Sequence, residues 1–205
     1  MTRIKLTKTE LKAQTDALRR FQRFLPMLQL KKQQLQGEIA QIVAKAEAVA
    51  ERERALRASL SGWTGLLATD AALVDGLVKV KSVNTGTANI AGVAIPTFDS
   101  IDTEVREIDV WATPAWLDDA AEAAKSILSL QCERAVYDEQ RRLVTIELQQ
   151  TSQRVNLFEK VKIPECKEAI RVIKIALGDE QTAAVTRGKI AKSRTPEASG
   201  GEDAA

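Results

Sequence analysis

The chain has 205 residues, of which 44% are hydrophobic, 28% are charged and only 4% are aromatic, and its formal net charge is +2. Globular cores are usually filled by bulky aromatic side chains, whereas coiled coils do without them, so this composition favours a long helical hairpin over a compact domain. The absence of histidine removes the commonest general base and the commonest metal ligand.

The small net charge hides an uneven distribution. Residues 1–62 carry a net charge of +7, residues 63–122 carry −7 and the remainder carries +2. Nothing at the amino end resembles a secretory signal, and no run approaches the roughly 18 apolar residues that a membrane span needs. The acidic middle argues against binding to an anionic membrane surface. We therefore expect a soluble chain without direct membrane insertion.

A long amphipathic helix is the first predicted element. Apolar residues return at spacings of three and four from Leu11 to Leu60, which makes one narrow seam and requires a partner helix along its length. Thr7 and Glu10 have the spacing of a capping box, in which the hydroxyl and the carboxylate each bind a backbone amide. Pro26 interrupts the series, and we expect a kink there with the helix resuming.

Two charged residues, Lys32 and Glu53, occupy seam positions of this helix. Such residues can fix the register between two helices, or they can hold their charge at the edge of the seam, and the second possibility is favoured. The seam residues predicted for the first helix are Leu11, Leu18, Phe21, Leu25, Leu28, Leu35, Ile39, Ile42, Val49 and Leu56.

The pattern changes between Ser61 and Thr113. Glycines break the helical run around a short apolar piece, and residues 77–83 then alternate in the manner of a strand. Residues 98–110 alternate again. We predict two short strands that are joined through the glycine-bearing residues 84–96 and that cap the bend of the chain. Because an isolated pair of strands is marginal in water, the pair should lean on the helix ends or on another protein.

A second helix is predicted to begin at Thr113, with Pro114 in its first turn and acidic residues that complement its dipole. Pro164 predicts a second kink. Cys132 and Cys166 would lie roughly 50 Å apart on this helix, too far for a disulfide, which fits a reducing compartment. The seam residues predicted for this helix are Val144, Leu148, Val155, Phe158, Ile163, Ile170, Ile173 and Leu177.

The predicted fold class is mainly α, a long antiparallel two-helix coiled coil with a small β-hairpin-containing region at the bend. The predicted segments are the first helix (1–62), the bend region with a short helix and the hairpin (63–113), the second helix (114–187) and a disordered tail (188–205). A bend centred near residue 88 would set Pro26 beside Gln150 and Leu11 beside Glu165.

The chain offers little catalytic chemistry. The one Gly-Lys pair, Gly188-Lys189, lacks the other residues of a phosphate-binding loop. Carboxylate pairs such as Asp118 with Asp119 fall on solvated helix surfaces, where no apolar pocket would shift their pKa. Serine, threonine and cysteine lack a histidine to activate them. We predict no enzymatic activity, no catalytic residue, no cofactor and no metal.

Lysines and arginines of the amino-terminal helix raise the question of nucleic-acid binding. Only Phe21 and Phe24 among them could stack on bases, so a solvated or protein-facing surface is favoured and no nucleic-acid partner is expected.

Four strings carry a family resemblance: Leu6–Leu11 (LTKTEL), Leu25–Leu35 (LPMLQLKKQQL), Asn89–Pro96 (NIAGVAIP) and Thr151–Pro164 (TSQRVNLFEKVKIP). In these strings, which occur in matching order between about Leu6 and Lys192, the chain resembles the D-subunit family of V-type (A/V-type) ATPases, and specifically its bacterial branch. Pro26 departs from the continuous lysine-rich pattern of eukaryotic relatives.

The resemblance implies a non-catalytic central-stalk subunit on the cytoplasmic side of the membrane, peripheral and part of the soluble V1/A1 sector. Its termini would enter the head hexamer of catalytic A and B subunits, and its bend would face the membrane rotor. It would pair with the small F subunit and sit on the funnel-like subunit that caps the membrane ring. By position, the resemblance marks Leu6, Thr7, Lys8, Leu11 and the nearby Lys12 at the amino end, and Arg154, Val155, Asn156, Glu159, Ile163 and Pro164 in the second helix.

Two other classes of protein share part of this pattern. A prefoldin-like holdase chaperone also joins two helices through strands, but its helix tips would expose apolar residues, whereas the terminal segments here are rich in lysine and arginine. A nucleic-acid-binding coiled coil would predict salt-sensitive binding to DNA or RNA.

Overall fold

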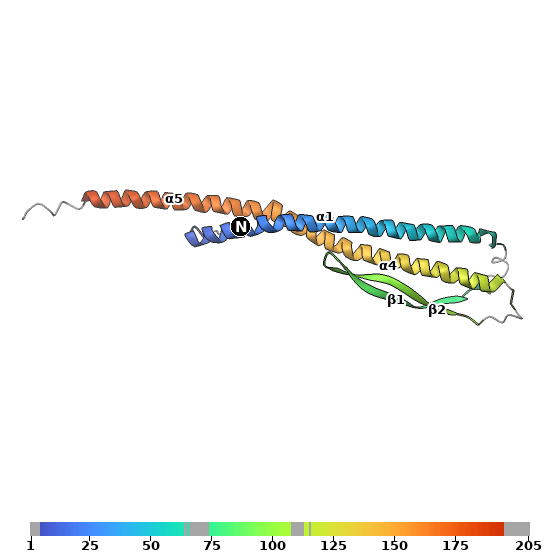
Figure 1. Cartoon of the computed structure of the whole chain (residues 1–205). Coiled ribbons are helices and arrows are strands. Elements are labelled where there is room, and N and C mark those ends of the chain that lie inside the picture. The colour runs from blue at the N-terminus through green and yellow to red at the C-terminus, as the bar shows by residue number, and fades with distance from the viewer. Residues whose placement is uncertain (1–4, 64, 66–73, 108–112, 115, 195–205) are drawn as a thin grey trace, which may run out of the picture. The chain divides into compact units, whose positions relative to one another are not determined.

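The computed structural model describes residues 5–63, 65, 74–107, 113–114 and 116–194. Its elements, in chain order, are helix α1 (Lys8–Ser59), a 3₁₀ turn (Leu60–Trp63), strands β1 (Val78–Ile90) and β2 (Val93–Val105), helix α4 (Trp116–Leu157), a π-helical turn (Phe158–Lys162) and helix α5 (Ile163–Arg194), as Figure 1 shows. The predicted fold class of two long helices with a hairpin between them is confirmed. The predicted short helix falls largely on residues 64 and 66–73, outside the described residues.

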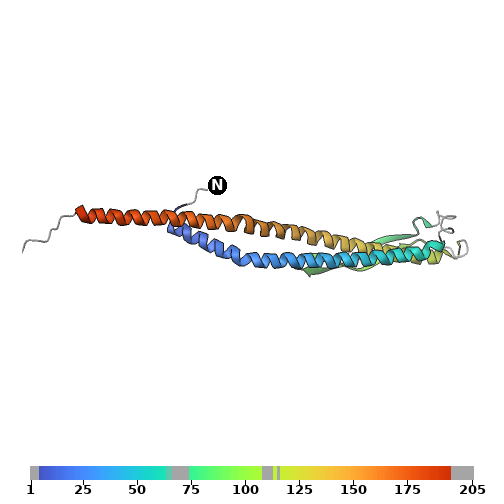
Figure 2. The same ribbon diagram turned by 90° about the horizontal axis from the view of Figure 1, so that it is seen from above.

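The chain divides into two compact units, which are described separately. The hairpin unit is Leu30–Ser152, and it holds most of α1, the two strands and nearly all of α4. The terminal unit is Met1–Gln29 with Gln153–Ala205, and it holds the start of α1, the π-helical turn and α5 (Figure 2).

Helix α1 starts close to the predicted cap. The hydroxyl of Thr7 accepts a hydrogen bond from the Glu10 amide at 3.2 Å, and the Thr7 carbonyl accepts one from the Leu11 amide at 3.0 Å. The carboxylate of Glu10 accepts a hydrogen bond from the Gln14 side chain at 2.8 Å. Of the two hydrogen bonds of a capping box, the structure therefore shows the one to the Thr7 hydroxyl. The helix then continues through Pro26 to Ser59, as predicted for its resumption.

The second predicted interruption takes the form of a π-helical turn. The amide of Ile163 donates to the carbonyl of Phe158, five residues back, immediately before Pro164. In a regular α-helix the ring of Pro164 would collide with the carbonyl four residues earlier, and the wider turn gives that carbonyl room. The helical path therefore continues into α5 without a loop.

Helix α5 ends later than predicted. It runs to Arg194, whereas the sequence pattern predicted a helix that ends at residue 187 and a disordered tail over residues 188–205. The hydroxyls of Thr182 and Thr186 each donate to the carbonyl four residues back at 3.0 Å, and Gly188 is accommodated in the helix interior. Residues 195–205 lie outside the described residues.

The strands are longer than predicted and meet in a tight turn. Residues 84–96, expected to be a connection, instead form the second half of β1 and the start of β2, and the turn itself is Ala91-Gly92. Both turn residues have positive φ, 51° and 88°, the signature of a type I′ turn, and the Asn89 side chain accepts from the Gly92 amide at 2.9 Å. The prediction took Gly86 as part of a connection, but Gly86 lies within β1, where the close approach of β2 leaves no room for a side chain. A methyl group there would lie 2.6 Å from the Thr97 hydroxyl.

The hairpin lies along the helices instead of capping the bend, which corrects the prediction. At its base, Leu77, Val78 and Val105 pack on Leu117 and Ala121 of α4. At its tip, Ile95 and its neighbours pack on Leu35, Ile42 and Val144. The helix rises about 40 Å from Leu117 to Val144, and a strand of 13 residues rises about the same distance, so the hairpin runs along α4 from Leu117 to Val144 (Figure 1).

The hairpin turns over along its length. The register shifts between Val80 and Ser82 and again between Asn84 and Thr85, which inserts one extra residue into each strand. Because of the two bulges, the apolar residues at the base of the hairpin lie on one face of the two-stranded ribbon, and the apolar residues at its tip lie on the opposite face. Two-stranded ribbons are strongly twisted and bulges add twist, which allows both ends to bury their apolar face. In between, Val80 and Val83 are left exposed.

Candidate functional site: the helix seam, its polar layers and the exposed termini

The predicted seam residues are all buried or half-buried. Those that are almost fully buried are Leu35, Ile42, Val49, Val144, Val155 and Ile173. On α1 the first three lie at intervals of seven, which is the spacing that predicted the seam. The remaining predicted seam residues keep part of their surface accessible.

Sequence reasoning missed several core residues because they are small, polar or outside the helices. Ile95 of β2 joins the core formed by Leu35, Ile42 and Val144. Leu77 and Leu117 form a second cluster at the base of the hairpin. The alternation of Val93 and Ile95 was a usable signal, because alternate residues of a strand share a face. On α5, Cys166 and Ala169 are buried at seam positions occupied by small side chains.

A polar layer links α1 and α4 near the end of α1. Glu53 is only 8% exposed, and its Oε1 atom accepts from Arg57 Nε at 3.0 Å, from Arg57 Nη2 at 2.8 Å and from Gln131 Nε2 of α4 at 3.1 Å. The Arg57 hydrogen bonds, and then the Gln131 bond, lower the pKa of Glu53. Next to it, Arg52 of α1 donates to both carboxylate oxygens of Glu133.

A second polar layer lies near the other end of the hairpin unit. Lys31 Nζ contacts Glu147 Oε1 at 2.6 Å, and both side chains are partly buried. The charged seam residue Lys32 is half-buried, but its neighbour Lys31 makes the ion pair. Because Lys31 pairs with Glu147 and Glu53 with Gln131, the two helices run antiparallel in this unit. A bend at residue 88 would have set Lys31 opposite residue 145 and Glu53 opposite residue 123, so the predicted register is two residues off at Lys31 and eight residues off at Glu53.

The hairpin is fixed to α4 by a buried polar contact as well. Gln140 of α4 is 6% exposed, and its Nε2 atom donates to the carbonyl of Pro96 in β2 at 2.5 Å. A side-chain amide at this seam-like position was not predicted, because periodicity identifies apolar residues and passes over polar ones. Thr151 is also buried in α4, with no partner for its hydroxyl among the described residues.

The terminal unit has a sparser core. Phe21 of α1 stacks on Phe158, with ring centroids 4.9 Å apart and planes tilted by 52°. Val155, Cys166, Ala169 and Ile173 are its buried apolar residues in the described part of the chain. Burial raises the pKa of the Cys166 thiol, with a smaller contribution from Glu165, so this free cysteine stays protonated and unreactive.

The predicted contact residues point away from the packed helices. Those exposed to solvent are Leu6, Thr7, Lys8 and Lys12 at the amino end and Arg154, Asn156 and Glu159 beyond Ser152. The same unit exposes large apolar side chains, namely Phe24, Met27, Leu157, Val161, Ile175, Val185 and Ile190. These apolar side chains are accessible to a partner.

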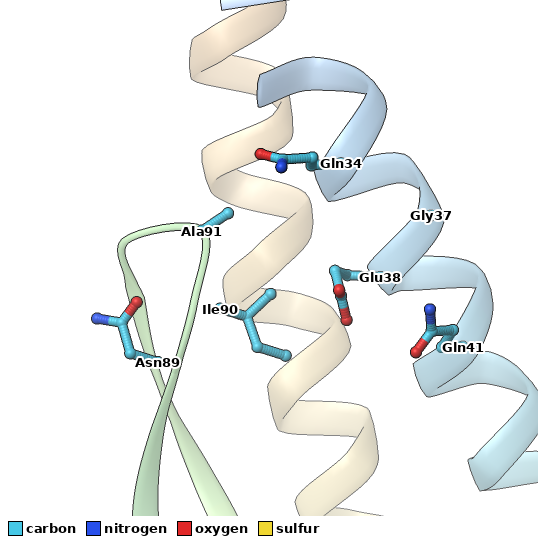
Figure 3. A pocket seen from close by; sticks show the side chains of 7 residues that line it. All are labelled: Gln34, Gly37, Glu38, Gln41, Asn89, Ile90 and Ala91. Atoms are coloured by element: carbon cyan, nitrogen blue, oxygen red, sulfur yellow. The ribbon is translucent and has the colours of Figure 1, made fainter. Parts of the chain in front are cut away.

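The grooves of the hairpin unit are open and lack the chemistry of an active site. One, of about 420 Å³, lies between the α1 residues Gln34, Glu38 and Gln41 and the hairpin residues 89–91 (Figure 3). Another, of about 230 Å³, lies between α1 and α4. Within the described residues, no three acidic or cysteine side chains are placed to hold a metal ion, and no helix is long and apolar enough to cross a membrane.

These features define the class of protein: a helix pair stiffened by a hairpin, with a regular apolar seam, polar layers that set its register, and exposed helical termini suited to partners. The comparisons with known proteins name the family. The family model that matches residues 10–193 is described as the D subunit of ATP synthase. The chain therefore belongs to the ATP synthase D-subunit family.

Curated relatives support the same assignment over nearly the whole chain. The V-type ATP synthase D subunit of Borreliella burgdorferi is 46% identical, over 94% of this chain and 95% of the relative. Those of Chlamydia felis and Chlamydia trachomatis serovar L2 are each 32% identical, over 94% of this chain and 94% and 96% of the relatives. The D subunit is a non-catalytic stalk component of a rotary complex, in agreement with the predicted absence of enzymatic activity and against a holdase.

Proposed function

We propose that this chain is the axle of a V/A-type ATPase. It turns with the rotor and transmits torque between ATP hydrolysis or synthesis in the A and B subunits of the head and ion translocation in the membrane ring. The observation that carries the proposal is the seam of the hairpin unit, whose apolar core lies between two polar layers that join α1 to α4. An axle must resist twisting and sliding, and it needs no active site.

The termini are the part that enters the head in this proposal. Residues 178–193 of α5 are exposed throughout. This segment contains Gly178, Gly188 and several β-branched residues, and a solitary helix of this length and composition is marginal in water. A surrounding partner would stabilise the helix and cover Val185 and Ile190, which are 60% and 46% exposed.

The other partners follow the same assignment. The end that carries the connections to the hairpin faces the membrane, where it meets the funnel-like subunit that caps the rotor ring, and the F subunit binds along the shaft. The chain then works on the cytoplasmic side, peripheral to the membrane, within the soluble V1/A1 sector. The basic amino end is held by acidic loops of the head.

The test is charge reversal at the amino end of α1. Lys8 and Lys12 are exposed, and substituting both by Glu should weaken the coupling of ATP hydrolysis to ion pumping in reconstituted enzyme while leaving the helical signal of the isolated chain unchanged. Lys45→Glu, an exposed reversal in the hairpin unit, is the control. Coupling ratios that are equal in the double variant, the control and the unaltered enzyme would refute the proposed contact with the head.

A further inference from the structure

One edge of the hairpin carries unpaired backbone groups. A two-residue turn makes Ile90 and Val93 a hydrogen-bonded pair, and hydrogen-bonded and outward-facing pairs then alternate along the strands. Thr85, Thr87 and Asn89 therefore direct their N–H and C=O groups away from β2. All three residues are exposed, and among the described residues none of these backbone groups has a hydrogen-bond partner.

The opposite edge, on β2, is blocked at Pro96. Pro96 stands across from Thr87 and has no N–H to offer, and its carbonyl accepts the hydrogen bond from Gln140 of α4. This bond places the Pro96 carbonyl on the outer edge of β2, which is the position that the alternation assigns to it. At Pro96 the outer edge of β2 is therefore bonded to α4, whereas the outward backbone groups of Thr87, across from it, are not bonded within the described residues.

The open edge lacks the usual protection against strand pairing. Natural edge strands usually carry charged side chains, proline or bulges, which prevent pairing with a strand of another chain. The stretch Ser82–Ile90 contains no charged residue and no proline, and both register shifts lie before Thr85 is paired. Val83, Thr85 and Thr87 are β-branched residues that favour strands. Such an edge is available for pairing with a further strand.

We propose that the β1 edge over Thr85–Asn89 is the docking site for an extended segment of another subunit of the complex, which adds to the hairpin as a third strand. The inference rests on the assignment of the chain to a rotary complex. The backbone groups at Thr85, Thr87 and Asn89 supply the affinity, because strand addition satisfies main-chain donors and acceptors. An uncharged segment fits, since this stretch of β1 offers no charge for an ion pair.

The groove at the end of β1 adds a preference for one end of that segment. It is lined by Asn89, Ile90 and Ala91 of the hairpin and by Gln34, Glu38 and Gln41 of α1 (Figure 3). Glu38 is the charged residue of this lining, so a basic or amide side chain at the end of the segment matches it.

Amide hydrogen exchange in the isolated chain and in the purified complex tests the proposal. In the isolated chain the amides of Thr85, Thr87 and Asn89 should exchange rapidly, whereas those of Gly86, Ala88 and Ile90, which bond to β2, should be protected. In the complex the first three should slow by about tenfold or more. If they exchange equally fast in both states while amides of α5 become protected, the chain is assembled and the edge is not used. If nothing becomes protected, the proposed function fails as well.

A backbone substitution provides the second test. Thr87→Pro removes one outward N–H and no bond to β2, while Thr87→Ala keeps the N–H and removes the same side chain. Titrated into complex that lacks the chain, Thr87→Pro should bind about tenfold more weakly than Thr87→Ala. Equal binding, with Gly86 and Ala88 still protected, would overturn the proposal. A dimer of the isolated chain that Thr87→Pro abolishes would make a second copy the occupant and would also overturn it.

Discussion

The hairpin unit and the terminal unit use the same pair of helices with different packing. In the hairpin unit, β2 contributes a third layer, and Leu35, Ile42, Ile95 and Val144 form a core from which water is nearly excluded. In the terminal unit no strand covers the described helices, and its buried apolar residues all lie in α4 and α5. Of the large apolar side chains that are strongly exposed, most belong to the terminal unit.

The difference teaches what two helices can achieve alone. A narrow seam buries one side of each helix and leaves the residues beside the seam exposed to water, so a stable pair needs a third layer or a partner. The hairpin supplies that layer within the chain. The terminal unit leaves its apolar flanks for the head of the complex, according to the proposed function. Substitutions in the two units should therefore have different effects on the isolated chain.

The largest effect is expected from Leu35→Ala in the hairpin unit. Leu35 is fully buried, and removing its side chain should lower the free energy of unfolding by about 3 kcal/mol through lost burial and a residual cavity. Leu30→Ala, five residues earlier and 59% exposed, is the matched control and should change it by less than about 0.5 kcal/mol. Urea denaturation followed by circular dichroism measures both, and equal losses would contradict the account of the core.

Gln140→Ala should have the next largest effect. It leaves the partly buried Pro96 carbonyl without its donor from α4, which should cost about 1–2 kcal/mol in the free energy of unfolding. Gln149→Ala, at an exposed position of the same helix, should be close to neutral. Faster amide exchange in β2 of the Gln140 variant, with helix amides unchanged, would locate the loss at the hairpin contact.

A double-mutant cycle at Phe21 and Phe158 examines the terminal unit. The tilted stacking of these rings predicts a coupling energy of about 1 kcal/mol between Phe21→Leu and Phe158→Leu. The cycle is measured by thermal unfolding of the isolated chain, with Leu18→Ala and Phe158→Leu as the comparison pair. Strict additivity of the two phenylalanine substitutions would mean that the rings do not stabilise this unit.

Substitutions at the two turn residues should change the stability of the hairpin in opposite directions. Gly92 has φ of 88° and open space around it, so Gly92→Ala should destabilise the hairpin by about 1 kcal/mol through backbone strain alone. Ala91 bears a similar strain at φ of 51°, and Ala91→Asn should stabilise the hairpin by about 0.5 kcal/mol, because asparagine tolerates this conformation. Chemical denaturation of both variants measures the difference, and the same sign for both would contradict the type I′ assignment.

The smallest effect concerns pH. The pKa of Glu53 is lowered in the folded chain, so its charged form stabilises the fold above the ordinary pKa of a glutamate, and this contribution is lost as pH falls through the lowered value. Glu53→Gln should therefore flatten the acid limb of stability against pH. Denaturation at a series of pH values from neutral down to below the ordinary glutamate pKa of 4.5 tests this, with Glu51→Gln, at an exposed position, as the control. An unchanged acid limb in the Glu53 variant would mean that Arg57 and Gln131 do not favour the charged form.

The helices were open to prediction from local pattern. A period of seven over α1 identified Leu35, Ile42 and Val49 as seam residues, and Thr7 marked the start of the helix. The second helix was identified in the same way through Val144, Val155 and Ile173. The extent of the strands was not, because Gly86, Thr87 and Asn89 have the composition of a loop when their cross-strand neighbours are unknown.

The sequence alone determined which residues face a partner helix and that a pair of strands lies between two long helices, since periodicity is a property of neighbouring residues. The tertiary structure decided where the hairpin packs, which polar residues are buried and how the helices are aligned. Gln140 meets Pro96, and Glu53 meets Gln131, across 44 and 78 residues of sequence. Contacts between residues so far apart depend on the path of the whole chain, and a single sequence carries no local signal for them.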